Sequence, residues 1–284
     1  MSIGSEEDRR AGRNAIGIVL VLALAGGAWW WWQRPKSNEV EPAEVAMHEI
    51  AEVIVPGVPE PIQHPLEVAP EPPAAAADAP PVDPDVAAQD GMLEVFGGQL
   101  AEWLVTDQLA RRLVATVDNL PRNLSVEKLR PLRPPATSFL VERETIDATV
   151  GEERITLAAA NHARYDTVVT LLASADAATA ATVYRRIYPQ LQAGYEDLGY
   201  PGRYFNDRLV AVIDHLLATP EPTGPLLLEQ PKVLYRFADA DLEARSSGQK
   251  LLLRMGVAHA RTVKQKLSEF RALIATPAPD NNKE

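Results

Sequence analysis

The uneven distribution of proline and basic residues limits how much of this chain can fold. Of the 24 prolines, 12 lie between Pro35 and Pro84, and after Lys36 no lysine or arginine occurs before Arg111. A proline-rich segment with charges of one sign stays extended and buries too little apolar surface to offset the entropy of folding. We therefore predict a disordered linker, rich in Pro, Glu and Ala, over residues 33–85.

The sequence after this linker has the balanced charge of a folded domain. Residues 91–276 carry 22 basic and 22 acidic residues, so the net charge of −11 comes mainly from the linker. A neutral domain argues against a nucleic-acid partner, because phosphate binding needs a basic surface. The chain has no cysteine, which excludes disulfides and thiolate metal sites. We predict a folded domain over residues 86–276, a disordered tail over residues 277–284, and neither a cofactor nor a metal.

An uncharged apolar run of 18 residues begins at Ala15 and ends at Trp32, reading AIGIVLVLALAGGAWWWW. As a helix it would span about 27 Å, close to the hydrocarbon thickness of a bilayer. Its four terminal tryptophans suit the aromatic belt of a membrane interface. We predict a single transmembrane signal-anchor helix over residues 15–32 of the inner membrane, with residues 1–14 in the cytoplasm and the domain in the periplasm. The alternative is a signal peptide cleaved after the small residues Ala23-Leu24-Ala25.

The linker then has two interpretations. It is a spacer that carries the domain away from the membrane, or a passive connection without a partner of its own. Its histidines, His48 and His64, are expected to be solvated in either case.

Apolar periodicity predicts a mainly α fold for the domain, a compact multi-helix domain with one small β-hairpin. The hairpin is expected from two short runs, residues 138–143 and 154–157, on either side of Gly151. Ser246 or Ser247 is expected to cap one short helix, while His162 is expected to be exposed near the start of another. The predicted helices cover residues 86–119 with a break at Gly97-Gly98 and a cap at Asp107, a segment of about 12 residues from Asn161, and residues 180–198, 206–217, 233–245, 250–255 and 257–274.

Five of the seven tyrosines fall in one stretch, which begins at Tyr184 and ends at Leu217. Apolar and aromatic residues recur there at helical spacing, including Tyr184, Tyr188 and Tyr195. Because this stripe keeps its phase across Pro189, we expect one kinked helix in preference to two separate helices. Glycine at position 199 is expected to end the helix, and Pro201-Gly202 to form a type II turn.

Four stretches resemble one known family. They are QLARRLVATVDNLPR from Gln108, RPLRPP from Arg130, YRRIYPQLQAGYEDLGYPGRYFNDRLVAVIDHLL from Tyr184, and QPKVLYRFADADLEARSSGQKLLLRMG from Gln230. They are similar to an uncharacterised bacterial membrane-anchored family catalogued as domain of unknown function 3014, over residues 87–275. The resemblance implies one N-terminal membrane helix, a variable proline-rich stretch and a domain outside the inner membrane. It implies no reaction and no catalytic residue.

Two short patterns could carry chemistry but have simpler interpretations. Ser247 and Lys250 match an S-x-x-K pattern, yet the companion motifs of such acyl enzymes are missing, so a helix cap and a surface lysine are expected. Asp214 and His215 are sequence neighbours, which a helix turns about 100° apart, so they are not expected to act as a pair. His259 is likewise expected to be a solvated or packed residue.

The best candidate for a ligand site is the turn with Tyr200, Arg203, Tyr204, Asn206 and Asp207. Tyrosine offers apolar area with a polar tip, arginine offers a fork of donors, and a helix beginning near Asn206 offers backbone donors to an anion. This combination could bind a peptide or a cell-wall fragment. The competing interpretation is a structural corner, with Asn206 capping the next helix and the tyrosine hydroxyls bonded to backbone.

The sequence therefore favours a binding or scaffolding module, with an envelope protein or cell-wall peptide as its partner. The rival hypothesis is a hydrolase that acts on envelope polymers at the same turn. A hydrolase requires an acid and a base that converge on one cleft. The side chains that could do so are Arg203, Asp207, Asp214 and His215.

Overall fold

In the computed structural model of this chain, the residues that can be described are 61–66, 82–123, 129–133, 138–147, 149 and 151–275. The predicted membrane helix at residues 15–32 and most of the predicted linker lie outside these ranges. The described part is mainly helical, as predicted, and also contains a small antiparallel sheet.

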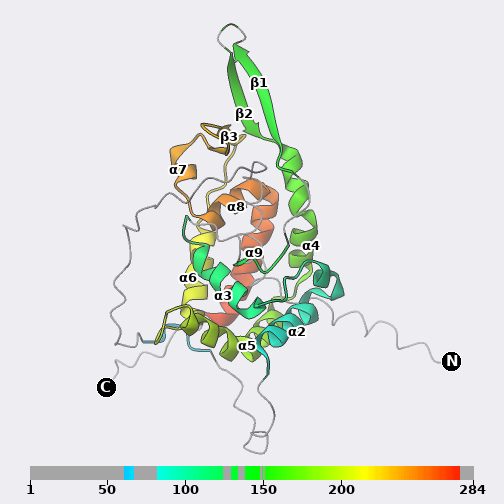
Figure 1. Cartoon of the computed structure of the whole chain (residues 1–284), viewed down its shortest axis with the longest axis vertical. Helices are drawn as coiled ribbons and strands as arrows, with labels where there is room; N and C mark the ends of the chain where they lie inside the picture. Colours follow the sequence, from blue (N-terminus) through cyan, green and yellow to red (C-terminus); the bar gives the residue numbers. More distant parts are fainter. Residues whose placement is uncertain are drawn as a thin grey trace, which may run out of the picture.

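Two long helices form the centre of the domain (Figure 1). Helix α5 (Ala177–Asp197) contacts α2, α3, α6 and α9, while α9 (Val257–Ile274) contacts α4, α5, α6 and α8. Their buried faces belong to one large apolar cluster, which includes Tyr184, Tyr195 and Phe270. The other helices are α2 (Pro84–Phe96), η3 (Gly98–Glu102), α3 (Leu109–Asn119), η5 (Ala159–Tyr165), α4 (Asp166–Ser174), α6 (Phe205–Leu217), α7 (Ala240–Glu243) and α8 (Ser247–Met255).

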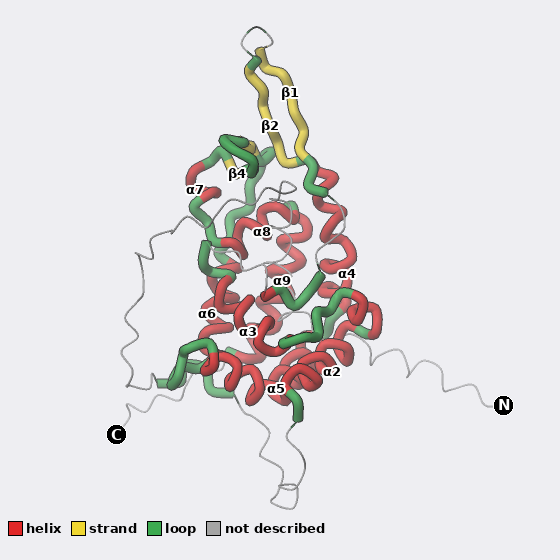
Figure 2. The backbone as a smooth tube through the Cα atoms, viewed as in Figure 1, coloured by secondary structure: helices red, strands yellow, loops and turns green. Residues whose placement is uncertain are grey.

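The predicted hairpin is confirmed and is longer than expected. Strands β1 (Val141–Asp147) and β2 (Glu152–Leu157) pair antiparallel and project away from the helices (Figure 2). Two further strands, β3 (Leu227–Glu229) and β4 (Arg236–Phe237), extend the sheet in the order β1-β2-β3-β4. Only the base of this sheet is buried, in a second, smaller apolar cluster.

The prediction of a helix over residues 233–245 is wrong. Phe237 pairs with Leu228 in the sheet and is almost fully buried in the second cluster, so this stretch is extended. A helix begins only at Ala240, where the Asp239 side chain accepts hydrogen bonds from the first backbone N–H groups. The single turn of α7 is all that remains of the prediction.

Two predicted features of the other helices also need correction. Helix α2 begins at Pro84, two residues before the predicted start, because Asp83 caps it and proline suits the first helical position. Asp107 does not cap α3, since Gln108 lies at the cap with a left-handed φ of 52°. Helix α5 is a single helix that contains Pro189, so the expectation of one helix in preference to two is confirmed.

Within the ranges described above, no single helix is both long and apolar enough to cross a bilayer. One pair of segments, 159–174 and 177–197, meets that test only when joined across a bend of 88°.

Candidate functional site

The turn between α5 and α6 is built by two glycines with positive φ angles. Gly199 follows the end of α5 with a φ of 102°, and Gly202 follows Pro201 with a φ of 76°. The backbone N–H of Arg203 reaches the carbonyl of Tyr200 at 3.3 Å, which closes the predicted type II turn. The sequence prediction of this turn is therefore confirmed.

Gln192, on α5, holds the far side of the turn. Its Oε1 accepts a hydrogen bond from the backbone N–H of Phe205 at 2.8 Å, and its Nε2 donates to the carbonyl of Arg203 at 2.8 Å. The first orphan N–H of α6 is thus satisfied by a side chain from the preceding helix. Asn206 does not cap α6, contrary to the prediction, and its side chain is available for other contacts.

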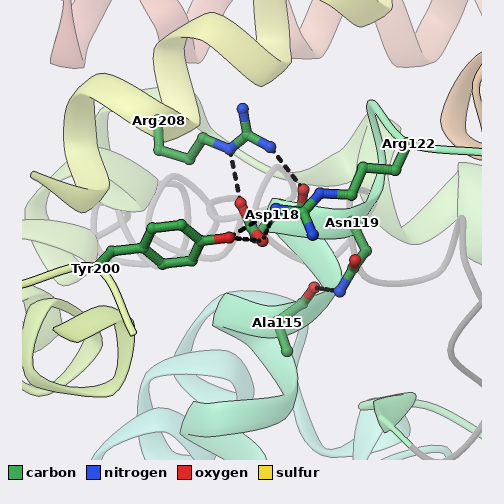
Figure 3. A network of polar contacts seen from close by, with 6 residues as sticks. All are labelled: Ala115, Asp118, Asn119, Arg122, Tyr200 and Arg208. Carbon is green, nitrogen blue, oxygen red and sulfur yellow. Dashed lines mark hydrogen bonds and ion pairs between the residues drawn. The ribbon is translucent and has the colours of Figure 1, made fainter. Parts of the chain in front are cut away.

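Tyr200 points away from the rest of the turn, toward a buried carboxylate on α3. Its hydroxyl donates to Asp118 Oδ2 at 3.1 Å and accepts from Arg122 Nη2 at 2.6 Å. Arg208 completes this cluster with Nε donating to Asp118 Oδ1 at 2.9 Å (Figure 3). The Asp118 side chain is 6% exposed, so its charge depends on these donors. Tyr200 acts here as part of a structural corner.

Asn206 is the most heavily used side chain of the turn. It is 1% exposed, and its Oδ1 accepts from the hydroxyl of Tyr184 at 3.1 Å. Its Nδ2 donates to the carbonyl of Ile274 at 3.0 Å and to the carbonyl of His64 at 2.7 Å. Both amide hydrogens and the amide oxygen are therefore engaged. One side chain joins α5, the end of α9 and a segment of the predicted linker.

Asp207, the next residue, holds the same segment by its main chain. Its Oδ2 accepts from the backbone N–H of Gln63 at 3.0 Å, and its Oδ1 accepts from the backbone N–H of His64 at 2.7 Å. The carboxylate lies in the first turn of α6, where the helix dipole favours a negative charge. We call Asn206 and Asp207 together the Asn206–Asp207 site.

Residues 61–66, which read PIQHPL, are the occupant of this site. The chain bends at Gln63 and His64, so that two successive N–H groups meet one carboxylate. Leu66 is half-buried and packs against the large apolar cluster. The expectation that His64 is solvated is wrong, because its main chain is bonded and the residue is half-buried.

The five residues predicted to form one site therefore divide between two places. Asn206 and Asp207 form the Asn206–Asp207 site, whereas Tyr200 belongs to the Asp118 cluster. Arg203 and Tyr204 are half-buried between them and contribute backbone carbonyls to Gln192 and to the N–H of Arg208. Sequence reasoning missed the occupant, although residues 61–66 interrupt the linker composition with neither an acidic residue nor an alanine.

The side chains that a hydrolase would require are not brought together. Asp207 binds residues 61–66, while Asp214 pairs with Arg271 on α9. His215 Nε2 contacts Ser246 Oγ at 2.8 Å, and burial lowers the pKa of its imidazole below the ordinary value. Each of these groups already has its own structural partner.

The two residues of the S-x-x-K pattern bond to different partners. Ser247 Oγ donates to the carbonyl of Arg122 at 2.6 Å, and Ser246 caps α8. Lys250 is 1% exposed and pairs with Glu243 at 2.8 Å, so the expectation of a surface lysine is wrong. The serine hydroxyl and the lysine ammonium thus serve different contacts.

The two remaining described histidines outside the turn, His259 and His162, contact neighbouring parts of the fold. His259 contacts the Met255 carbonyl through Nδ1 and Asp166 through Nε2, each at 3.1 Å. His162, predicted to be exposed, is half-buried, and burial lowers its pKa. Among the residues whose positions are described, no group of three or more His, Cys, Asp or Glu side chains could hold a metal ion.

The fold and site define a helical domain that carries a segment of its own chain on one helix terminus. The chain belongs to the family described as Protein of unknown function (DUF3014), which matches residues 109–271. Comparison with curated proteins and with solved structures finds no match.

Proposed function

We propose that this chain is a binding or scaffolding module whose domain captures a peptide segment at the Asn206–Asp207 site. The observation that supports the proposal is the way this site holds residues 61–66. Three hydrogen bonds join the site to main-chain groups of this segment, two from N–H donors and one to a carbonyl. Main-chain contacts give affinity, and a neighbouring apolar pocket for side chains gives selectivity.

The proposed setting is the periplasmic face of the inner membrane. The apolar run at residues 15–32 would anchor the chain, and the acidic linker would hold the domain outside the bilayer. A protein segment is the favoured ligand, because the occupant is an ordinary peptide whose Leu66 reaches the apolar cluster. We therefore favour a protein segment over a cell-wall peptide.

The test uses the full chain in lipid nanodiscs with the resident segment weakened. Gln63→Pro together with His64→Pro removes both N–H donors to Asp207 without changing the domain. A fluorescent peptide copy of residues 59–68, PEPIQHPLEV, should bind this opened variant with a dissociation constant on the order of 100 µM. Anisotropy measures the binding.

Two controls make the result specific. Adding Asp207→Ala to the opened variant should abolish binding, whereas Asp197→Ala, an exposed acid at the end of α5, should not. A peptide N-methylated at the positions of Gln63 and His64 keeps every side chain and should not bind. Equal binding of the methylated peptide, or no binding to the opened variant at millimolar peptide, would overturn the proposal.

A further inference from the structure

We infer that residues 61–66 are a resident ligand of the Asn206–Asp207 site, and that a partner peptide must carry the same features and compete with them. This inference rests on the proposed peptide-binding function and specifies both the ligand class and how the site is regulated. The site is occupied by its own chain, so a partner gains access only by displacement.

The main-chain contacts define the first requirement for a competing peptide. Asp207 accepts from two successive N–H groups, and Asn206 donates to the carbonyl of the second residue. These three groups lie within Gln63 and His64. A partner therefore needs two consecutive residues that are not proline, in a bend that turns both N–H groups to one side.

The residues after the bend define the second requirement. Proline at position 65 biases His64 away from helical backbone angles, which favours the bent arrangement before it is bound. Leu66 then packs against the large apolar cluster. The partner sequence should thus read as two residues with free N–H groups, then proline, then an apolar residue.

The side chains of Ile62 and Gln63 are not read by the site. Gln63 is exposed, and Ile62 is 39% exposed. Substitution of either side chain should leave the main-chain contacts in place. We therefore expect the site to select residues at and after the bend of a peptide ligand, and to accept many different side chains before it.

Because residues 61–66 are covalently connected to the domain, even a weak affinity is enough for them to occupy the Asn206–Asp207 site. Fifteen residues, 67–81, separate the resident segment from the next described part of the chain. A connection of this length gives a tethered ligand an effective concentration on the order of 1 mM. If the intrinsic dissociation constant is on the order of 100 µM, the resident segment weakens a competing peptide about tenfold.

The experiment compares three full-length chains in nanodiscs with the labelled peptide PEPIQHPLEV. The unmodified chain should bind about tenfold more weakly than the opened variant Gln63→Pro/His64→Pro. The control Gln63→Ala changes only an exposed side chain, retains both N–H groups and should behave like the unmodified chain. Replacing leucine by alanine in the peptide should weaken binding to all three.

The outcomes separate this inference from the function on which it rests. Equal affinity for the unmodified and opened chains would overturn self-occupancy while leaving peptide binding intact. No binding to any chain would overturn the proposed function itself. Sedimentation checks whether the resident segment comes from the same chain. If the unmodified chain is dimeric and the opened variant is monomeric, two copies exchange their segments. That result would contradict occupancy within one chain.

Discussion

Two aspartates, Asp118 on α3 and Asp207 in the first turn of α6, use the same type of side chain in different ways. Asp118 is buried and is bonded by Arg122, Arg208 and Tyr200, which all belong to the folded domain (Figure 3). Among the described residues, Asp207 accepts from two neutral backbone donors, which belong to a segment more than 140 residues away in the sequence.

This difference separates a permanent contact from an exchangeable one. Removing a charge from a buried, charge-assisted cluster leaves its partners without compensation, which strongly destabilises a fold. Removing a partly exposed acceptor of backbone N–H groups lets water replace it at little cost. The Tyr200 end should therefore control stability, and the Asp207 end should control binding.

The largest expected effect is that of Asp118→Ala. The substitution leaves Arg208 and Arg122 facing a buried gap, so the free energy of unfolding should fall by about 3 kcal/mol. Urea denaturation followed by circular dichroism measures the change. A loss no greater than that of Asp207→Ala would erase the distinction between the two aspartates.

A smaller loss is expected for Tyr184→Phe, a buried side chain beside the Asn206–Asp207 site. The change removes the hydroxyl that donates to Asn206 Oδ1, and a buried acceptor without a donor costs about 1–2 kcal/mol. The same denaturation experiment measures it. Tyr188→Phe is the matched control, because that hydroxyl donates to Gln192 Oε1 and meets Asn206 only at its backbone, so the Asn206 side-chain oxygen keeps its donor.

Alkaline pH should weaken the Tyr200 end gradually. Tyr195 stacks on Tyr200 at 4.6 Å, and burial raises the pKa of its phenol to about 12. The unfolded chain loses this proton near pH 10, so stability should be level below about pH 10 and fall between about pH 10 and 12. Tyr195→Phe should reduce that slope in denaturation curves, whereas an unchanged slope would contradict the assignment.

The smallest effect on stability is expected for Asp207→Ala, at less than about 1 kcal/mol. Its effect on the resident segment should be much larger. Limited proteolysis of the full chain should cleave within residues 61–66 faster in this variant than in Asp197→Ala. Equal cleavage rates would show that the carboxylate does not hold the segment.

The sequence predicted those elements whose signal is local. Helix α9 has the predicted bounds, because its apolar stripe is long and continuous. The hairpin was predicted by its two short runs around Gly151. Strands β3 and β4 were missed, since two or three residues carry no period and gain their structure from pairing.

The sequence located the candidate site but did not predict its hydrogen-bond partners or the segment bound to it. A polar residue after a turn is typical of a helix cap, and Asn206 has that position. Its actual role depends on Tyr184, Ile274 and His64, which no local pattern connects to it. Composition likewise hid residues 61–66 inside a linker that reads as unstructured.

Hydrogen–deuterium exchange of the full chain in nanodiscs tests the central claim most directly. If Asp207 holds the segment, fragments that cover the Gln63 and His64 amides should exchange more slowly than fragments from residues 37–55 of the linker. This protection should disappear in Asp207→Ala and persist in Asp197→Ala. Exchange at the linker rate in the unmodified chain, or protection that survives Asp207→Ala, would contradict the account.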